Sequence, residues 1–189
     1  MYKSTILKLL FPLLLSCTEA PEKNTQLEQL PVYTDDSLMS PPDTTITVNT
    51  SSIKTGATTP DEVLAFSKTL KGIPYKYSST DPRKGFDCSG FITYVFNHFN
   101  IEVPRTSAGF TNEGATVSLA EVKPGDLILF TGTDSTIRTV GHMGIITQSG
   151  DSVVFIHSTS GKANGVTETT LNQYYMGRFV KVIRVFPVQ

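Results

Sequence analysis

The stretch FDCSGFITYVFNHF, residues 86–99, joins a cysteine to a run of apolar side chains. The apolar residues after the cysteine recur at helical spacing, at Phe91, Ile92, Val95, Phe96 and Phe99. This periodicity predicts a helix, although the β-branched and aromatic content would also allow a strand. In a helix, Cys88 would lie in the first turn beside Asp87, a candidate N-cap. Free backbone N–H groups and the helix dipole would favour a thiolate there, whereas the simpler alternative is a buried structural cysteine.

A second helix is predicted upstream of this stretch. Thr59 suits the N-cap, Pro60 suits the first helical position, and Glu62 completes a capping box. Gly72 is expected to end the helix. We expect this helix to serve as scaffold.

Two histidines fall in segments that we expect to be adjacent strands, 141–148 and 151–157, joined by Ser149-Gly150. A two-residue hairpin loop would pair His142 directly with His157 on one face, with Cβ atoms ~5 Å apart. A slip of one residue in register would put the rings on opposite faces. If the register holds, one imidazole can act as a base and the other can orient it, as a cysteine nucleophile requires.

Six short motifs follow one another in this part of the chain: Ile73-Pro-Tyr-Lys-Tyr77, Phe86-Asp-Cys-Ser-Gly-Phe91, Val103-Pro-Arg-Thr-Ser107, Lys123-Pro-Gly-Asp-Leu127, Gly141-His-Met-Gly-Ile145 and Phe155-Ile-His-Ser158. In this order they resemble the NlpC-type bacterial cell-wall cysteine peptidases, which act on peptidoglycan stem peptides. The resemblance covers about 61–185 and is nearest to small lipoprotein members with a single catalytic domain. It implies an α+β, papain-like fold, with N-terminal helices packed on a central antiparallel sheet of about five strands. It requires no cofactor and no metal.

The resemblance also implies roles for individual residues. Cys88 is similar to the family's nucleophile, His142 to the base that later protonates the leaving amine, and His157 to the group that orients His142. Tyr75 matches an active-site tyrosine that contacts the substrate or helps the oxyanion. The backbone N–H of Cys88 would be a further oxyanion donor.

Asp87 and Ser89 match positions that hold a free amine of the substrate in some relatives. Asp87 has a competing interpretation as a helix cap, and Ser89 as an ordinary first-turn residue. His98 is expected to point away from Cys88. We expect Arg105 to anchor a loop and Asp126 to stabilise a turn.

The leading hypothesis is a peptidoglycan endopeptidase that cuts either a D-Glu–diamino acid bond or a D-Ala–diamino acid cross-link through a thioester on Cys88. One alternative is an inactive cell-wall-binding module of the same fold. Another is a zinc hydrolase with Cys88, His142 and His157 as ligands. We expect a monomer with peptidoglycan stem peptides as its partner.

The first 16 residues predict an export signal. Lys3 and Lys8 are the only charges in this segment, and its apolar run is shorter than the ~20 residues that span a bilayer. The sequence Leu14-Leu15-Ser16-Cys17 resembles a bacterial lipoprotein signal, in which Cys17 carries the lipid. We therefore expect a lipid-anchored protein of the cell envelope, at the outer membrane and facing the periplasm.

Residues 17–57 predict a flexible, acidic, Thr/Ser/Pro-rich tether, because they contain few large apolar side chains. One exception is 44–50, which alternates and could form an edge strand. Residues 58–189 are long enough for one domain with a hydrophobic core.

The whole chain of 189 residues has a formal net charge of −1 and contains 17% charged residues and two cysteines. This composition gives no electrostatic footprint for nucleic acid, and it is atypical of disordered and disulfide-stapled proteins.

Overall fold

The computed structural model describes residues 53–187. The predicted signal segment, the lipidation site Cys17 and the candidate edge strand 44–50 lie outside the described residues. Ile53, which precedes the predicted start of the domain at residue 58, is buried in the core. No helix among residues 53–187 is long and apolar enough to cross a membrane.

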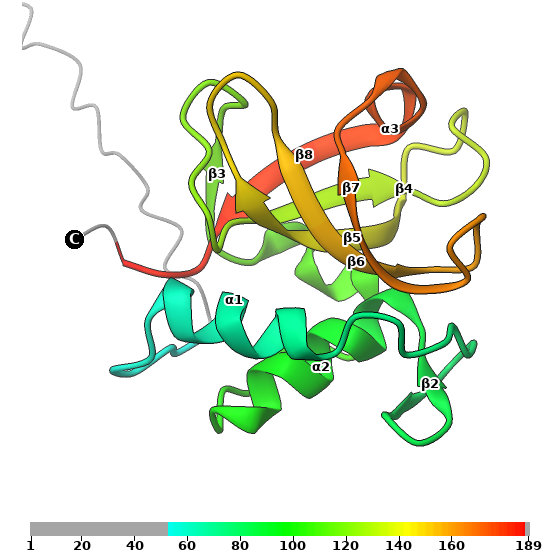
Figure 1. Ribbon diagram of the computed structural model, residues 1–189. Helices are drawn as coiled ribbons and strands as arrows, with labels where there is room; N and C mark the ends of the chain where they lie inside the picture. Colours follow the sequence, from blue (N-terminus) through cyan, green and yellow to red (C-terminus); the bar gives the residue numbers. More distant parts are fainter. Residues whose placement is uncertain (1–52, 188–189) are drawn as a thin grey trace, which may run out of the picture. The chain divides into compact units, whose positions relative to one another are not determined.

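The domain is built on a six-stranded antiparallel sheet with the strand order β3-β8-β4-β5-β6-β7 (Figure 1). Its strands are β3 (Ala115–Val117), β4 (Leu127–Thr131), β5 (Val140–Gln148), β6 (Val154–Thr159), β7 (Gly165–Thr170) and β8 (Phe179–Arg184). The smaller elements are a hairpin of β1 (Thr80–Asp81) and β2 (Gly85–Phe86), a 3-10 helix η1 (Ser107–Asn112) and a short helix α3 (Gln173–Arg178).

Two N-terminal helices, α1 (Pro60–Thr69) and α2 (Cys88–His98), lie on one side of this sheet, and α3 lies on the other (Figure 1). The predicted α+β, papain-like fold is therefore confirmed, with six strands in the main sheet rather than about five.

Both predicted helices begin where the sequence indicates. Thr59 caps α1 and forms the reciprocal capping box with Glu62. Asp87 caps α2, because its carboxylate accepts from the backbone N–H of Gly90 at 2.5 Å. Cys88 is thus the first residue of α2, as expected.

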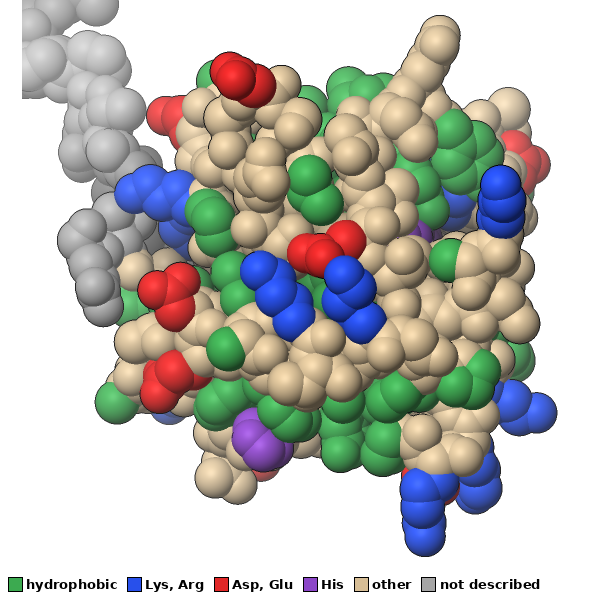
Figure 2. All heavy atoms as spheres, viewed as in Figure 1, with side chains coloured by type: hydrophobic (Ala, Val, Ile, Leu, Met, Phe, Trp, Pro, Cys, Tyr) green, Lys and Arg blue, Asp and Glu red, His purple; other side chains and the backbone are tan. Residues whose placement is uncertain are grey.

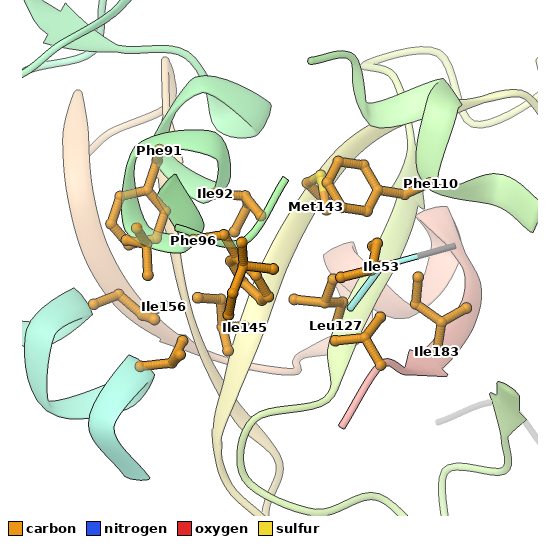
Figure 3. Close-up of a cluster of buried hydrophobic side chains, with 14 of the residues drawn as sticks. Ile53, Phe91, Ile92, Phe96, Phe110, Leu127, Met143, Ile145, Ile156 and Ile183 are labelled. Atoms are coloured by element: carbon orange, nitrogen blue, oxygen red, sulfur yellow. The ribbon is translucent and has the colours of Figure 1, made fainter. Parts of the chain in front are cut away.

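The apolar face of α2 fills the centre of the core. Phe91, Ile92, Val95 and Phe96 are all fully buried. Figure 3 shows Phe91, Ile92 and Phe96 among side chains of the sheet, including Ile145 of β5 and Ile156 of β6. This burial fixes the orientation of α2, and so the position of the cysteine at its first turn.

The β5–β6 hairpin brings the two histidines together in a register that differs from the prediction. Ile145 pairs with Ile156 and Gln148 with Val154, so that residues 149–153 form the connection instead of a two-residue turn. The expectation that His142 lies directly opposite His157 is therefore wrong. The register is displaced by an even number of residues, which keeps both side chains on the same face of the sheet.

The close approach of β5 and β6 depends on Gly144. A Cβ atom there would lie 2.8 Å from the Ile156 carbonyl oxygen and 3.2 Å from the Cβ of His157. Gly144→Ala should destabilise the domain by about 1–3 kcal/mol, because the neighbouring strand has to shift. The midpoint of urea unfolding measures this loss.

Gly177→Ala is the matched control, because a Cβ there meets no atom within 4 Å and Gly177 lies inside α3. This variant should be neutral or slightly more stable. Equal stability of the two variants would contradict the proposed close approach.

Candidate active site

The thiol of Cys88 is held between two neighbours at the start of α2. Its Sγ lies 3.3 Å from Ser107 Oγ and 3.8 Å from the carbonyl oxygen of Gly141. Because a carbonyl oxygen only accepts, the thiol proton goes to Gly141, and the hydroxyl of Ser107 can then donate to the sulfur. Deprotonation of Cys88 would strengthen the contact with Ser107 and lose the one with Gly141.

The two histidines form a direct hydrogen bond inside the sheet. His142 Nε2 lies 2.8 Å from His157 Nδ1, and His157 Nε2 lies 2.9 Å from Thr169 Oγ1. His157 is fully buried and His142 is 8% exposed. For Nδ1 of His142 to accept a proton, the single proton of the neutral ring must be on Nε2, which then donates to His157. This arrangement leaves a free lone pair on Nδ1 of His142.

A cleft of about 1000 Å³ brings the candidate residues together. Cys88, His142 and Tyr75 all line it, together with Arg178 and Lys162. The segment of Tyr75 reaches this place because Tyr75 bridges to Phe86, immediately before the cap of α2. Nδ1 of His142 makes no hydrogen bond to any residue in the described part of the chain, so its lone pair is unoccupied.

Burial sets the protonation states of the cleft. It raises the pKa of Cys88, an effect that the hydrogen bond from Ser107 partly offsets. Burial also lowers the pKa of His142 well below 6.5, and the neighbouring His157 and Arg178 lower it further. For His157, burial and then the charge of Arg178 lower the pKa to about 3. The free site therefore holds a neutral thiol beside two neutral imidazoles.

The free protein therefore does not hold Cys88 as a thiolate, although the helix start acts on the thiol in the expected direction. The N-terminal backbone N–H groups do lower the pKa of the thiol, but desolvation outweighs them. Burial of the sulfur by the whole fold therefore outweighs the local effect of the helix start on the pKa of Cys88.

Asp87 and Ser89 are held in a network beside the cysteine. Arg105 donates to both carboxylate oxygens of Asp87, at 3.1 and 2.7 Å, and to Ser89 Oγ at 3.0 Å. Both residues are buried, and neither lines the cleft. Asp87 therefore caps α2, and Arg105 ties the loop that follows α2 to its first turn. Asp126 pairs with Arg184 at 2.7 Å and accepts from the backbone N–H of Lys123 within its turn.

The remaining histidine lies elsewhere, as expected. The ring of His98 stacks on Phe66 with their centroids 3.7 Å apart, at the exposed end of α2.

The geometry counts against the zinc alternative. His142 and His157 direct ring nitrogens at each other instead of at a common point. Within residues 53–187, no three His, Cys, Asp or Glu side chains are placed to hold a metal ion.

Three residues of the site had no role assigned to them from the sequence. Ser107 belongs to one of the family-like motifs, but only the tertiary structure places its hydroxyl on Cys88. Thr169 lies on β7, a strand that the sequence analysis did not predict, and it completes the hydrogen-bonded chain from His142. Arg178, at the end of α3, contributes a buried positive charge to the cleft.

Comparison with known proteins identifies the family of this chain. The sequence profile of the NlpC/P60 family matches residues 72–185, which include Cys88, both histidines and Tyr75. The chain belongs to the NlpC/P60 family.

Among its relatives is the gamma-DL-glutamyl hydrolase of Bacillus subtilis, 30% identical over 128 residues, which are 68% of this chain and 30% of that protein. The murein DD-endopeptidase MepS/murein LD-carboxypeptidase of Escherichia coli is 32% identical over 117 residues, 61% of this chain and 57% of that protein. A crystal structure of an NlpC/P60 family protein from Bacillus cereus superposes with a TM-score of 0.61 at 28% identity, covering 71% of this chain and 42% of that one. The matched part thus spans from under a third to just over half of these relatives.

The contact of Ser107 with Cys88 predicts a change in thiol reactivity. Ser107→Ala removes a donor to the thiolate, so the pKa of Cys88 should rise and alkylation by iodoacetamide at pH 7 should slow by about three- to tenfold. Ser107→Thr keeps the hydroxyl and should react nearly like the wild type. Ser67→Ala is the control, because that buried serine bonds the Leu64 carbonyl within α1. An unchanged pH profile for Ser107→Ala would refute the role of this hydroxyl.

The buried histidines predict a loss of stability in acid. As the pH falls from about 6.5 towards 3, the unfolded chain takes up a proton that folded His157 does not bind. The free energy of unfolding is therefore highest above pH 6.5, and it should fall by up to about 1.4 kcal/mol per pH unit for each such histidine.

His157→Gln should make the fall of the unfolding free energy with pH shallower. The part of the slope that remains should come from His142, whose pKa is also lowered. Gly177→Ala is the control, because it leaves every titratable side chain in place and should keep the wild-type slope. Urea unfolding between pH 4 and 8 measures both. A slope that His157→Gln leaves unaltered would show that His157 does not titrate as described.

Proposed function

We propose that the protein is a peptidoglycan endopeptidase that hydrolyses amide bonds of stem peptides or their cross-links through a thioester on Cys88. The observation that carries this proposal is the meeting of Cys88 and His142 in one cleft, with the ring of His142 held by His157. Membership of the NlpC/P60 family and the names of its relatives support the substrate class.

The first half of the reaction needs a base and an oxyanion site. Nδ1 of His142 takes the thiol proton while Sγ of Cys88 attacks the amide carbon. The negative charge that develops on the substrate oxygen is stabilised by the backbone N–H of Cys88 at the start of α2, with Tyr75 at the same cleft. His142 then gives its proton to the leaving amine, the C–N bond breaks, and the acyl group remains on sulfur.

The second half regenerates the enzyme. His142 removes a proton from a water molecule, whose oxygen attacks the thioester carbon. The C–S bond breaks, the proton on His142 passes to the departing thiolate, and a carboxylic acid leaves the cleft. His157 acts throughout as the orienting group, because its Nδ1 lone pair accepts the Nε2 proton of His142.

The neutral free state has a consequence for this mechanism. A carboxylate partner would stabilise a protonated His142 by its negative charge, but His157 offers only a lone pair. Proton transfer from Cys88 should therefore accompany attack on the substrate rather than precede it. This coupling also limits the exposure of a reactive thiolate when no substrate is bound.

The names of two relatives suggest two candidate bonds. One relative is named a gamma-DL-glutamyl hydrolase and another a murein DD-endopeptidase, so the D-Glu–diamino acid bond and the D-Ala–diamino acid cross-link are both candidates. The predicted signal segment and the acyl site Cys17 would place the enzyme in the cell envelope, anchored by lipid at the outer membrane and facing the periplasm. We propose that it acts there as a monomer.

The direct test is digestion of purified muropeptides followed by mass spectrometry of the products. Cys88→Ala should lower the rate by at least about 1000-fold, because it removes the nucleophile. His98→Gln changes a residue outside the cleft and should cleave at the wild-type rate. Equal product from the wild type and Cys88→Ala would refute the mechanism, and no product from either would favour an inactive wall-binding module.

A further inference from the structure

Arg178 is a buried cation without a carboxylate partner among the described residues. It is 8% exposed, and its guanidinium donates to the carbonyl oxygens of Gly132 at 2.8 Å and Thr131 at 2.9 Å. A third bond goes to the hydroxyl of Tyr174 at 2.9 Å, and the guanidinium also lies over the rings of Tyr174 and Tyr175. All of these partners are neutral, so none of them balances the charge.

Two other arginines, unlike Arg178, form ion pairs with carboxylates. Arg105 binds Asp87 at 2.7 Å, and Arg184 binds Asp126 at 2.7 Å. Burying a charge without a counter-ion is costly, and proteins commonly avoid it by pairing. Arg178 is the exception within residues 53–187, and unlike Arg105 and Arg184 it lines the cleft. Its three hydrogen bonds use three of the five guanidinium N–H groups, and the other two make no hydrogen bond within residues 53–187.

The charges that line the cleft all have one sign. Lys162 and Arg178 are the charged residues of its described lining, which contains no Asp and no Glu. On the face drawn in Figure 2, by contrast, acidic and basic side chains are interspersed. A concave site with charges of one sign attracts a ligand of the opposite sign. The charges of this cleft therefore favour an anionic ligand.

We propose that Arg178, with Lys162 at the rim, binds a free carboxylate of the substrate and selects stem peptides that carry one near the scissile amide. This inference rests on the proposed function. Stem peptides offer such groups on D-Glu, on the diamino acid and at the terminal D-Ala. A planar guanidinium recognises a carboxylate with two parallel hydrogen bonds, which an amide in its place cannot reproduce.

Binding of the carboxylate would also affect the base. The positive charge of Arg178 contributes to the low pKa of both His142 and His157 in the free protein. A bound carboxylate offsets that charge, so His142 becomes a better proton acceptor once the correct substrate is in place. Recognition of the carboxylate should therefore raise kcat as well as lower KM.

The test compares one muropeptide as the free acid with three forms, each amidated at a single carboxylate. For the wild type, amidation of the recognised carboxylate should lower kcat/KM by about tenfold or more, as the loss of a hydrogen bond to a charged group does. Arg178→Gln should cleave the acid and that amide at similar rates, and Arg178→Lys should restore part of the preference. Arg83→Gln removes one positive charge from an exposed side chain outside the cleft and should keep the full preference.

Because Arg178 also holds two backbone carbonyls, its variants could unfold. Lys162→Gln avoids this risk, because Lys162 is exposed, and it should lower the preference for the acid about two- to threefold. Titration calorimetry with Cys88→Ala measures the affinity for each substrate form without turnover. The acid should bind this variant more tightly than the amide does. Equal kcat/KM for the acid and all three amides in the wild type would overturn the carboxylate site but not the proposed function. Absence of cleavage for all four substrates overturns the proposed function, and the inference with it.

Discussion

The burial of one face of α2 against β5 and β6 is the constraint on which the rest of the site depends. Phe91, Ile92, Val95 and Phe96 leave this helix only one orientation on the sheet. Its first residue is the candidate nucleophile, and the strands beneath it carry the two histidines. The same packing that stabilises the domain therefore brings a thiol and an imidazole to one cleft.

Burial also sets the chemistry of that cleft. Desolvation disfavours the charged form of each titratable group, so it raises the pKa of Cys88 and lowers those of His142 and His157. The thiol and both imidazoles are thus kept neutral in the free protein. Arg178 differs from these groups, because the arginine side chain stays charged in proteins. Its hydrogen-bond partners are all neutral. The positive charge of Arg178 would favour an anionic ligand at this cleft.

Much of this domain could be predicted from local sequence. The capping box at Thr59, the cap at Asp87 and the spacing of Phe91 to Phe99 specify α1 and α2, because these signals act within a turn or two of the chain. The hairpin register could not be predicted, because it depends on the length of the connection 149–153. β3 and β7 occupy the two edges of the sheet, and neither has a strong apolar alternation.

The site was predictable only in part, for a related reason. Cys88, His142 and His157 stand in recognisable motifs, but Ser107 and Arg178 acquire their places through tertiary contacts alone.

The most direct measurement of the central claim is the protonation of the two histidine rings in the resting protein. ¹⁵N NMR of the ring nitrogens at neutral pH distinguishes neutral imidazole from imidazolium, and it shows which nitrogen carries the proton. The structure predicts one protonated nitrogen on each ring, Nε2 on His142 and Nε2 on His157. An imidazolium at either position, paired with a thiolate at Cys88, would contradict the account.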